Sequence, residues 1–207
     1  MMLTFIFVVL LLFLIPGPAV FLTITQTIKG GRKNGIVTGL GIAVGDFLHT
    51  VAAVLGLSAL LMTSSTAFEI VKYMGSGYLV YLGIRAIIEK AQKEEPMDRR
   101  EINSNSNISF RQAMLIELLN PKTSLFFLAF LPQFVKSGAT PVTIQLLVLG
   151  LTFVLMSLTY TTCLVLVTST IGNKLFTKTK KSAKWLGKAI GLVYIGLGIK
   201  LALQTQK

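Results

Sequence analysis

Asp46 is the most informative ionisable residue of this sequence, because it lies inside the apolar run GIVTGLGIAVGDFLHTVAAVLGLSALLM. An unpaired charge in hydrocarbon costs at least about 2.5–3.5 kcal/mol, so this carboxylate must take a proton, pair with a cation or bind a ligand. His49 follows three residues later and shares the helical face of Asp46. Imidazole changes charge near neutral pH. The pair could receive an ammonium group or carry a coupling proton, although a lone histidine serves equally well in packing.

Two motifs place helix-breaking residues inside apolar runs, IPGPAVFL early in the chain and LLNPKTSLFF in its second half. Their central residues are Pro16, Gly17, Pro18, Asn120, Pro121 and Lys122. Proline suits the first position of a helix, and glycine and asparagine both suit the position before it. Each run is therefore predicted to consist of two half-helices, the second of which offers free amides and a positive dipole end to an anion. The alternative is a plain proline kink.

The three features reach a similar depth. At about 1.5 Å per residue, the first motif lies roughly 20 Å from the start of its run. Asp46 lies roughly 15 Å, and Pro121 roughly 14 Å, into their own runs. Exposed backbone at such a depth is tolerated only where it is buried in protein or lines a wet cavity. Lys122 is the cationic partner expected for Asp46, and both a structural ion pair and a functional site remain open.

The composition requires a membrane. The chain has 207 residues, of which 53% are hydrophobic, and a mean hydropathy of +0.72. A soluble domain cannot hide that much apolar surface, whereas a bilayer accepts it. A span needs about 20 residues. Six runs approach or exceed that length, near residues 3–28, 36–62, 68–88, 112–135, 141–168 and 186–203. We expect an all-α membrane protein with six transmembrane helices.

The net charge is +12, and the positively charged residues are distributed in step with the predicted spans. Lysine and arginine gather in the first, third and fifth connections, whereas the second has none and the fourth has only Lys136. This alternation is typical of cytoplasmic loops. It predicts a multi-pass protein with both termini outside, and it argues against a nucleic-acid partner. The first run lacks a basic leader and its apolar pattern continues to Ile28, so it is predicted to be a retained span rather than a signal peptide.

The two halves of the chain resemble each other. Pro16 has a counterpart in Pro121 about 105 residues later, and Gly45 has one in Gly150 at the same offset. GYLVYLGI in the third run resembles IGLVYIGL in the sixth. Because each unit holds three spans, the second must be inverted relative to the first, an arrangement that recurs in secondary transporters. We expect repeats over 1–88 and 112–207, joined by a cytoplasmic linker over 89–111. The glycine-rich second run permits a homodimer.

Several function classes are disfavoured. Cys163 is the only cysteine, so no cysteine pair exists for a membrane thiol–disulfide carrier. Neither a metal-ligand cluster nor a nucleotide-binding loop appears, so we expect no enzyme, no metal and no cofactor. A scaffold would not need charged residues deep in the membrane. A transporter or channel for an inorganic cation remains the alternative to a transporter of small organic molecules.

Taken together, IPGPAVFL, GGRKNGIVTGLGIAVGDFLH, YLVYLGIR and LLNPKTSLFFLAFLPQFV resemble the lysine-exporter (LysE/RhtB) family of bacterial amino-acid exporters, from about residue 3 to 203. The resemblance implies export of amino acids or their derivatives across the cytoplasmic membrane, driven by the proton-motive force. It marks the residues of both breaks and Asp46 as positions of interest. Glu117 stands where an uncharged residue is expected.

These observations combine into one hypothesis, a secondary exporter that works by proton antiport and alternating access. A zwitterionic substrate would place its carboxylate at the half-helix N-termini near Lys122. Its ammonium group would lie near Asp46, where a proton competes with it.

Overall fold

The computed structural model describes residues 2–14, 16–63, 65–88, 106–136, 138 and 140–175, together with 192, 195–196, 198–199 and 202–203. Within these residues the chain is helical and contains no strand, which confirms the all-α prediction. The elements are α1 (Met2–Leu14), α2 (Pro18–Thr63), α3 (Ser65–Ile88), α4 (Ser106–Leu118), α5 (Pro121–Leu125), a π-helical turn η1 (Phe126–Phe130), a 3₁₀ turn η2 (Leu131–Phe134) and α6 (Val142–Leu175).

Two described helical stretches, Pro18–Leu57 and Val142–Thr170, are long and apolar enough to cross a membrane. A third candidate combines Phe110–Leu118 with Pro121–Phe134, which meet at an angle of 45°. The 13-residue α1 is apolar but short. Most of the predicted linker and of the sixth run, 186–203, lies outside the described residues. The number of spans and the inverted repeat therefore stay predictions.

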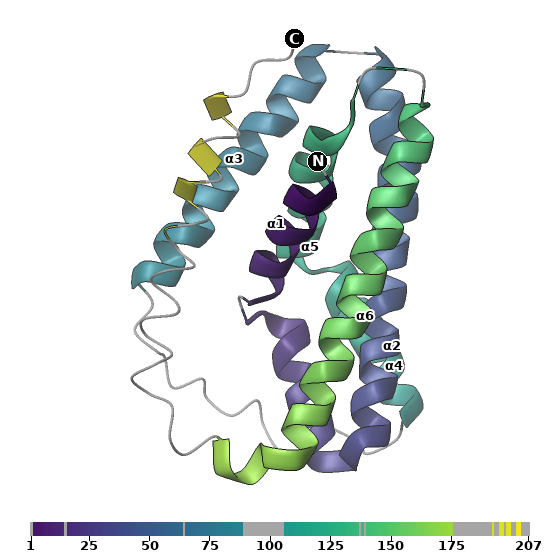
Figure 1. Cartoon of the computed structure of the whole chain (residues 1–207), viewed down its shortest axis with the longest axis vertical. Helices are drawn as coiled ribbons and strands as arrows, with labels where there is room; N and C mark the ends of the chain where they lie inside the picture. Colours follow the sequence, from purple (N-terminus) through teal and green to yellow (C-terminus); the bar gives the residue numbers. More distant parts are fainter. Residues whose placement is uncertain are drawn as a thin grey trace.

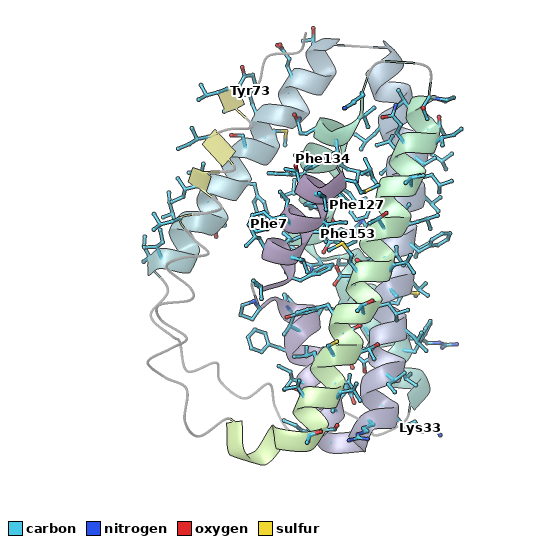
Figure 2. All side chains as sticks on the ribbon, in the orientation of Figure 1. Phe7, Lys33, Tyr73, Phe127, Phe134 and Phe153 are labelled. Atoms are coloured by element: carbon cyan, nitrogen blue, oxygen red, sulfur yellow. The ribbon has the colours of Figure 1, made fainter. Side chains whose placement is uncertain are left out.

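Helix α2 is a hairpin of two arms rather than one straight rod. Gly31 has φ 70° and ψ −170°, a left-handed conformation that glycine adopts without a steric penalty. The turn falls inside KGGRKNG, and Thr27 on the first arm contacts Gly35 on the second. Figure 1 shows the first arm descending from α1 and the second rising beside α6. Lys33 lies at the same end of the molecule as this turn (Figure 2).

The second arm of α2 packs closely on both sides because its glycines have no side chains. A Cβ built at Gly41 would lie 2.9 Å from Ala113 Cβ and 3.2 Å from the backbone nitrogen of Met114, on α4. A Cβ at Gly39 would lie 3.0 Å from Thr161 Oγ1, on α6. Small residues let helix backbones approach in this way. The glycines expected to permit a homodimer thus contact the chain's own helices and give no support to a dimer.

An aromatic core joins α1, η1 and α6. Phe153 on α6 lies at the centre, with its ring centroid 5.1 Å from those of Phe13 and Phe126 and 5.0 Å from that of Phe127. Figure 2 shows Phe127 and Phe153 between α1 and α6. Aromatic pairs at this separation add about 0.5–1.5 kcal/mol each to the effect of burial. The core therefore fixes the helical turns that follow Asn120 relative to α1.

Candidate functional site

The first site element is the interruption between α1 and α2. Helix α1 ends at Leu14 and α2 begins at Pro18. The Gly17 carbonyl accepts hydrogen bonds from the N–H groups of Val20 at 3.0 Å and Phe21 at 3.2 Å, so Gly17 opens the new helix. Proline at the next position has no N–H to leave unsatisfied. The C-terminal carbonyls of α1 and the N-terminus of α2 therefore both lie at this interruption.

The second element is the bend between α4 and α5. Helix α4 ends at Leu118, and Asn120 is the N-cap of α5, with its Oδ1 accepting a hydrogen bond from the backbone N–H of Lys122 at 3.1 Å. Pro121 occupies the first helical position. The Asn120 carbonyl continues the new helix by accepting from Ser124 N–H at 3.0 Å. Asn120 thus accepts hydrogen bonds from two backbone N–H groups in the first turn of α5, those of Lys122 and Ser124.

Lys122 connects the two interruptions. Its Nζ donates a hydrogen bond to the backbone carbonyl of Leu12, in the last turn of α1, at 3.3 Å. A Cβ built at Gly17 would lie 3.4 Å from the same Nζ. A cation near a helix C-terminus is favoured by the helix dipole. Two motifs more than a hundred residues apart therefore meet at one ammonium group.

Glu117 lies at the centre of the polar cluster. Its side chain is 4% exposed. The Nδ2 of Asn120 donates to its two carboxylate oxygens at 3.3 and 3.2 Å, and the Thr123 hydroxyl donates to Oε1. The ring of His49 donates from Nε2 to the Glu117 backbone carbonyl at 3.1 Å. Glu117 is thus held by groups from both sides of the bend and from α2.

Asp46 faces this cluster without a hydrogen-bond donor. It is 1% exposed, and neither carboxylate oxygen has a hydrogen-bond partner among the described residues. Its electrostatic neighbours are Glu117, Ser157 and Lys122, on three other helices. A Cβ built at the adjacent Gly45 would lie 2.8 Å from Glu117 Cβ, so α2 and α4 are in close contact here. Asp46 and Lys122 share no hydrogen bond in the described structure.

The His49 ring packs against an aromatic side chain in addition to making its hydrogen bond. Its ring stacks on Phe127, with the centroids 5.7 Å apart and the planes at 25°. With Nε2 donating to a carbonyl, the imidazole supports the bend between α4 and α5.

The structure brings together five of the residues that the sequence singled out, Gly17, Asp46, His49, Asn120 and Lys122. The three prolines lie at the same interruptions but are more exposed. Thr123 and Ser157 also belong to the cluster and were not predicted. Glu117 belongs to it too, and the sequence marks that residue only as a departure from the family pattern. The spacing of Glu117, three residues before Asn120, is a sequence signal for its contact with Asn120 but does not place it beside Asp46.

Gln26 is a second buried polar side chain without a partner. It is fully buried on the first arm of α2, and both its amide nitrogen and its amide oxygen lack hydrogen-bond partners among the described residues. Thr23 and Thr27, on the same arm, are also buried, but each hydroxyl donates to a carbonyl four residues earlier. Such an amide is usually satisfied by protein or by ordered water.

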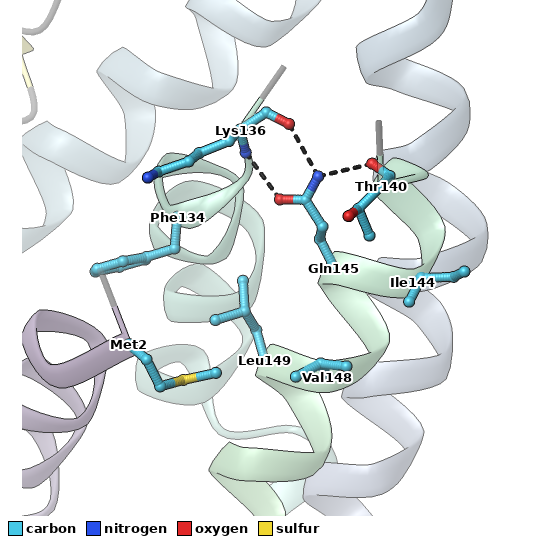
Figure 3. A pocket seen from close by; sticks show the side chains of 8 residues that line it. All are labelled: Met2, Phe134, Lys136, Thr140, Ile144, Gln145, Val148 and Leu149. Carbon is cyan, nitrogen blue, oxygen red and sulfur yellow. Dashed lines mark hydrogen bonds between the residues drawn. The ribbon is translucent and has the colours of Figure 1, made fainter. Parts of the chain in front are cut away.

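A separate cavity of about 320 Å³ lies between the start of α1 and the start of α6 (Figure 3). Gln145 lies on one wall of this cavity. It donates to the carbonyls of Lys136 and Thr140 and accepts from Lys136 N–H, each at 2.9 Å, and these bonds hold its side chain in place. The other lining residues are mostly apolar, among them Ile144, Val148 and Leu149. This cavity lacks the cluster of charged residues found around Glu117.

Replacing Asn120 tests how the cluster is supported. We expect Asn120→Ala to lower the stability of the folded protein by about 0.5–2 kcal/mol, the usual cost of losing an N-cap. Asn120→Asp should cost more, although aspartate is a good cap, because its carboxylate would face Glu117. Thermal unfolding of the detergent-solubilised protein measures both effects. A stability of Asn120→Asp equal to the native protein's would show that the Asn120–Glu117 contact is unimportant.

A strongly apolar chain that is helical in its described residues, with buried charged residues gathered at two helix interruptions, is a membrane protein with an internal polar site. Residues 10–205 match the family described as LysE type translocator, and the chain belongs to this family, which confirms the resemblance carried by its motifs.

The chain is 31% identical, over 98% of both sequences, to a Bacillus subtilis (strain 168) protein named uncharacterized membrane protein YrhP. It is 29% identical to proteins named leucine efflux protein from Salmonella typhimurium and Salmonella typhi, over 91% of this chain and 88% of each relative. No solved structure matches it.

Proposed function

We propose that this protein is a secondary active exporter of amino acids or amino-acid derivatives across the bacterial cytoplasmic membrane. Its family and the relatives named for leucine efflux support this function. The observation that carries it is the meeting of both helix interruptions at Lys122, beside the buried carboxyl groups of Asp46 and Glu117. Such a cluster offers both a cation and anions to a zwitterion, between helices that are mostly apolar.

The substrate carboxylate would bind at the N-termini of α2 and α5, where helix dipoles and Lys122 favour an anion. Pro16, Gly17, Pro18, Asn120, Pro121 and Lys122 would shape this half of the site. The substrate ammonium group would bind near Asp46, whose carboxylate oxygens accept no hydrogen bond from the described residues. His49 would support the same half of the site from α2.

Interrupted spans supply the membrane architecture of this proposal. Helix α1 with 13 residues reaches roughly 20 Å, less than the roughly 30 Å of a hydrocarbon core, and the first arm of α2 would supply the remainder. Helix α4 with the segment from Pro121 to Phe134 would form a second interrupted span. Related by an inverted repeat, these spans would permit alternating access with both termini outside.

Transport in reconstituted vesicles tests the proposed function. We expect saturable uptake and counterflow with particular amino acids, and substrate accumulation driven by an imposed pH gradient. A panel of amino acids, derivatives and inorganic cations identifies the substrate class. Cation flux without amino-acid exchange would support the alternative, a transporter for an inorganic cation, whose ligand would again be the unpartnered carboxylate of Asp46.

Asp46→Asn removes the proposed coupling charge with little change in shape. We expect this variant to lose accumulation driven by a pH gradient, because an amide neither carries a proton nor attracts an ammonium group. The measurement is uptake in vesicles with and without the gradient, at equal amounts of folded protein. Full proton-coupled transport by Asp46→Asn would contradict the role assigned to Asp46.

A further inference from the structure

We propose that Asp46 and Glu117 act as one unit that holds a single exchangeable cation, a proton in one half of the transport cycle and the substrate ammonium group in the other. The inference rests on the proposed export function and deepens it. It assigns a role to Glu117 and a ratio of one proton to one substrate.

Glu117 is arranged as the permanent acceptor of this unit. Asn120 Nδ2 donates to both of its oxygens, and the Thr123 hydroxyl donates to one of them. Both oxygens of Glu117 therefore already accept hydrogen bonds from the chain itself, at the bend between α4 and α5.

Asp46 is arranged in the opposite way. It is as deeply buried as Glu117, but neither of its oxygens makes a hydrogen bond with a described residue, although the Ser157 hydroxyl lies near it. Two ionised carboxylates side by side in an apolar setting repel each other. One proton resolves the conflict, because a protonated Asp46 can donate to an oxygen of Glu117, the acidic side chain that faces it. The absence of a hydrogen bond to Asp46 from the described residues agrees with this arrangement, since a protonated Asp46 is itself a donor.

The other groups around the pair do not replace that proton. From α5, Lys122 directs its Nζ to the Leu12 carbonyl. From α2, His49 directs its Nε2 to the backbone carbonyl of Glu117 rather than to either carboxyl group. From α6, the polar neighbour is Ser157, which carries no charge. Among the described residues of the cluster, two carboxyl groups thus face one lysine, which leaves room for one further positive charge.

In the proposed cycle the proton and the substrate ammonium group compete for one position between the two carboxyl groups. On the cytoplasmic side the substrate ammonium enters between Asp46 and Glu117, the O–H bond of Asp46 breaks, and the proton passes to cytoplasmic water. The substrate carboxylate brings a negative charge of its own, which Lys122 and the positive end of the α2 dipole hold, so the ammonium alone takes the place of the proton between the two carboxyl groups. On the outer side the ammonium leaves, and a proton from outer water forms the O–H bond again. One proton moves inward for each substrate molecule moved outward.

Glu117→Gln tests the unit directly. With one carboxylate left, Lys122 can neutralise Asp46 and no proton is needed. We expect substrate accumulation driven by a pH gradient to fall to the level of protein-free vesicles, while exchange of substrate for substrate persists. Glu69→Gln is the matched control, because Glu69 is an exposed glutamate on α3, and it should transport like the native protein. Glu117→Asp should retain proton coupling.

A second measurement needs no variant of Glu117. Adding the transported amino acid to the detergent-solubilised native protein should release about one proton per substrate bound, as followed with a pH indicator, because one group titrates on ligand binding. The release should disappear in Asp46→Asn. The inference is overturned if native protein that transports amino acids releases no proton, or if Glu117→Gln accumulates substrate as the native protein does. If the native protein transports no amino acid, the proposed function itself fails.

Discussion

Lys122→Met is expected to reduce the initial rate of amino-acid transport by roughly 10- to 100-fold, because a charged hydrogen bond contributes about 1.5–3 kcal/mol. Lys122 is the group that joins the two helix interruptions, through its bond to the Leu12 carbonyl. Methionine keeps most of the length of the side chain but removes its charge. The substrate carboxylate then loses its only lysine among the described residues of the cluster.

Lys136→Met is the matched control for this experiment. Lys136 is exposed and follows η2, near the cavity between α1 and α6 rather than at the site. Both variants lose one positive charge, so a general effect of charge would affect them equally. We expect Lys136→Met to transport at the native rate, measured in vesicles with equal amounts of folded protein. Equal loss in both variants, or none in Lys122→Met, would remove Lys122 from the binding site.

Local chemistry explains what could be predicted from the sequence. The all-helical class follows from the length of the apolar runs, and the family follows from motifs whose spacing is kept along the chain. Gly31 allows the left-handed turn within KGGRKNG, and Asn120 caps the helix that begins at Pro121. These effects involve residues a few positions apart. Sequence patterns record such effects directly.

The position of Glu117 could not be predicted in the same way. Whether it faces lipid, a vestibule or Asp46 depends on the rotation of α4 about its axis. That rotation is set by contacts with glycines about seventy residues earlier, where Gly41 meets Ala113 and Gly45 meets Glu117. The same contacts explain why the glycine pattern was ambiguous. Small residues at this spacing indicate close packing but do not say which helix is the partner.

The packing of α2 against α4 predicts opposite effects for one substitution at two positions. Gly41→Ala is expected to destabilise the protein by about 1–3 kcal/mol, the usual cost of overpacking. Its Cβ would press on the Phe110 carbonyl and lie 2.9 Å from Ala113 Cβ. Gly56→Ala, on the same helix, has no atom within 4 Å of its Cβ. Alanine is favoured over glycine in a helix by about 0.5–1 kcal/mol, so this variant should be more stable.

Thermal unfolding of both variants in detergent measures the difference, and transport shows its consequence for the site. Because Gly41 sets the distance between α2 and α4, Gly41→Ala should also separate Asp46 from Glu117 and weaken proton coupling. Gly56→Ala should leave coupling unchanged. If both variants gained stability, α2 and α4 would not be in close contact, and the carboxyl pair that depends on this contact would lose its structural basis.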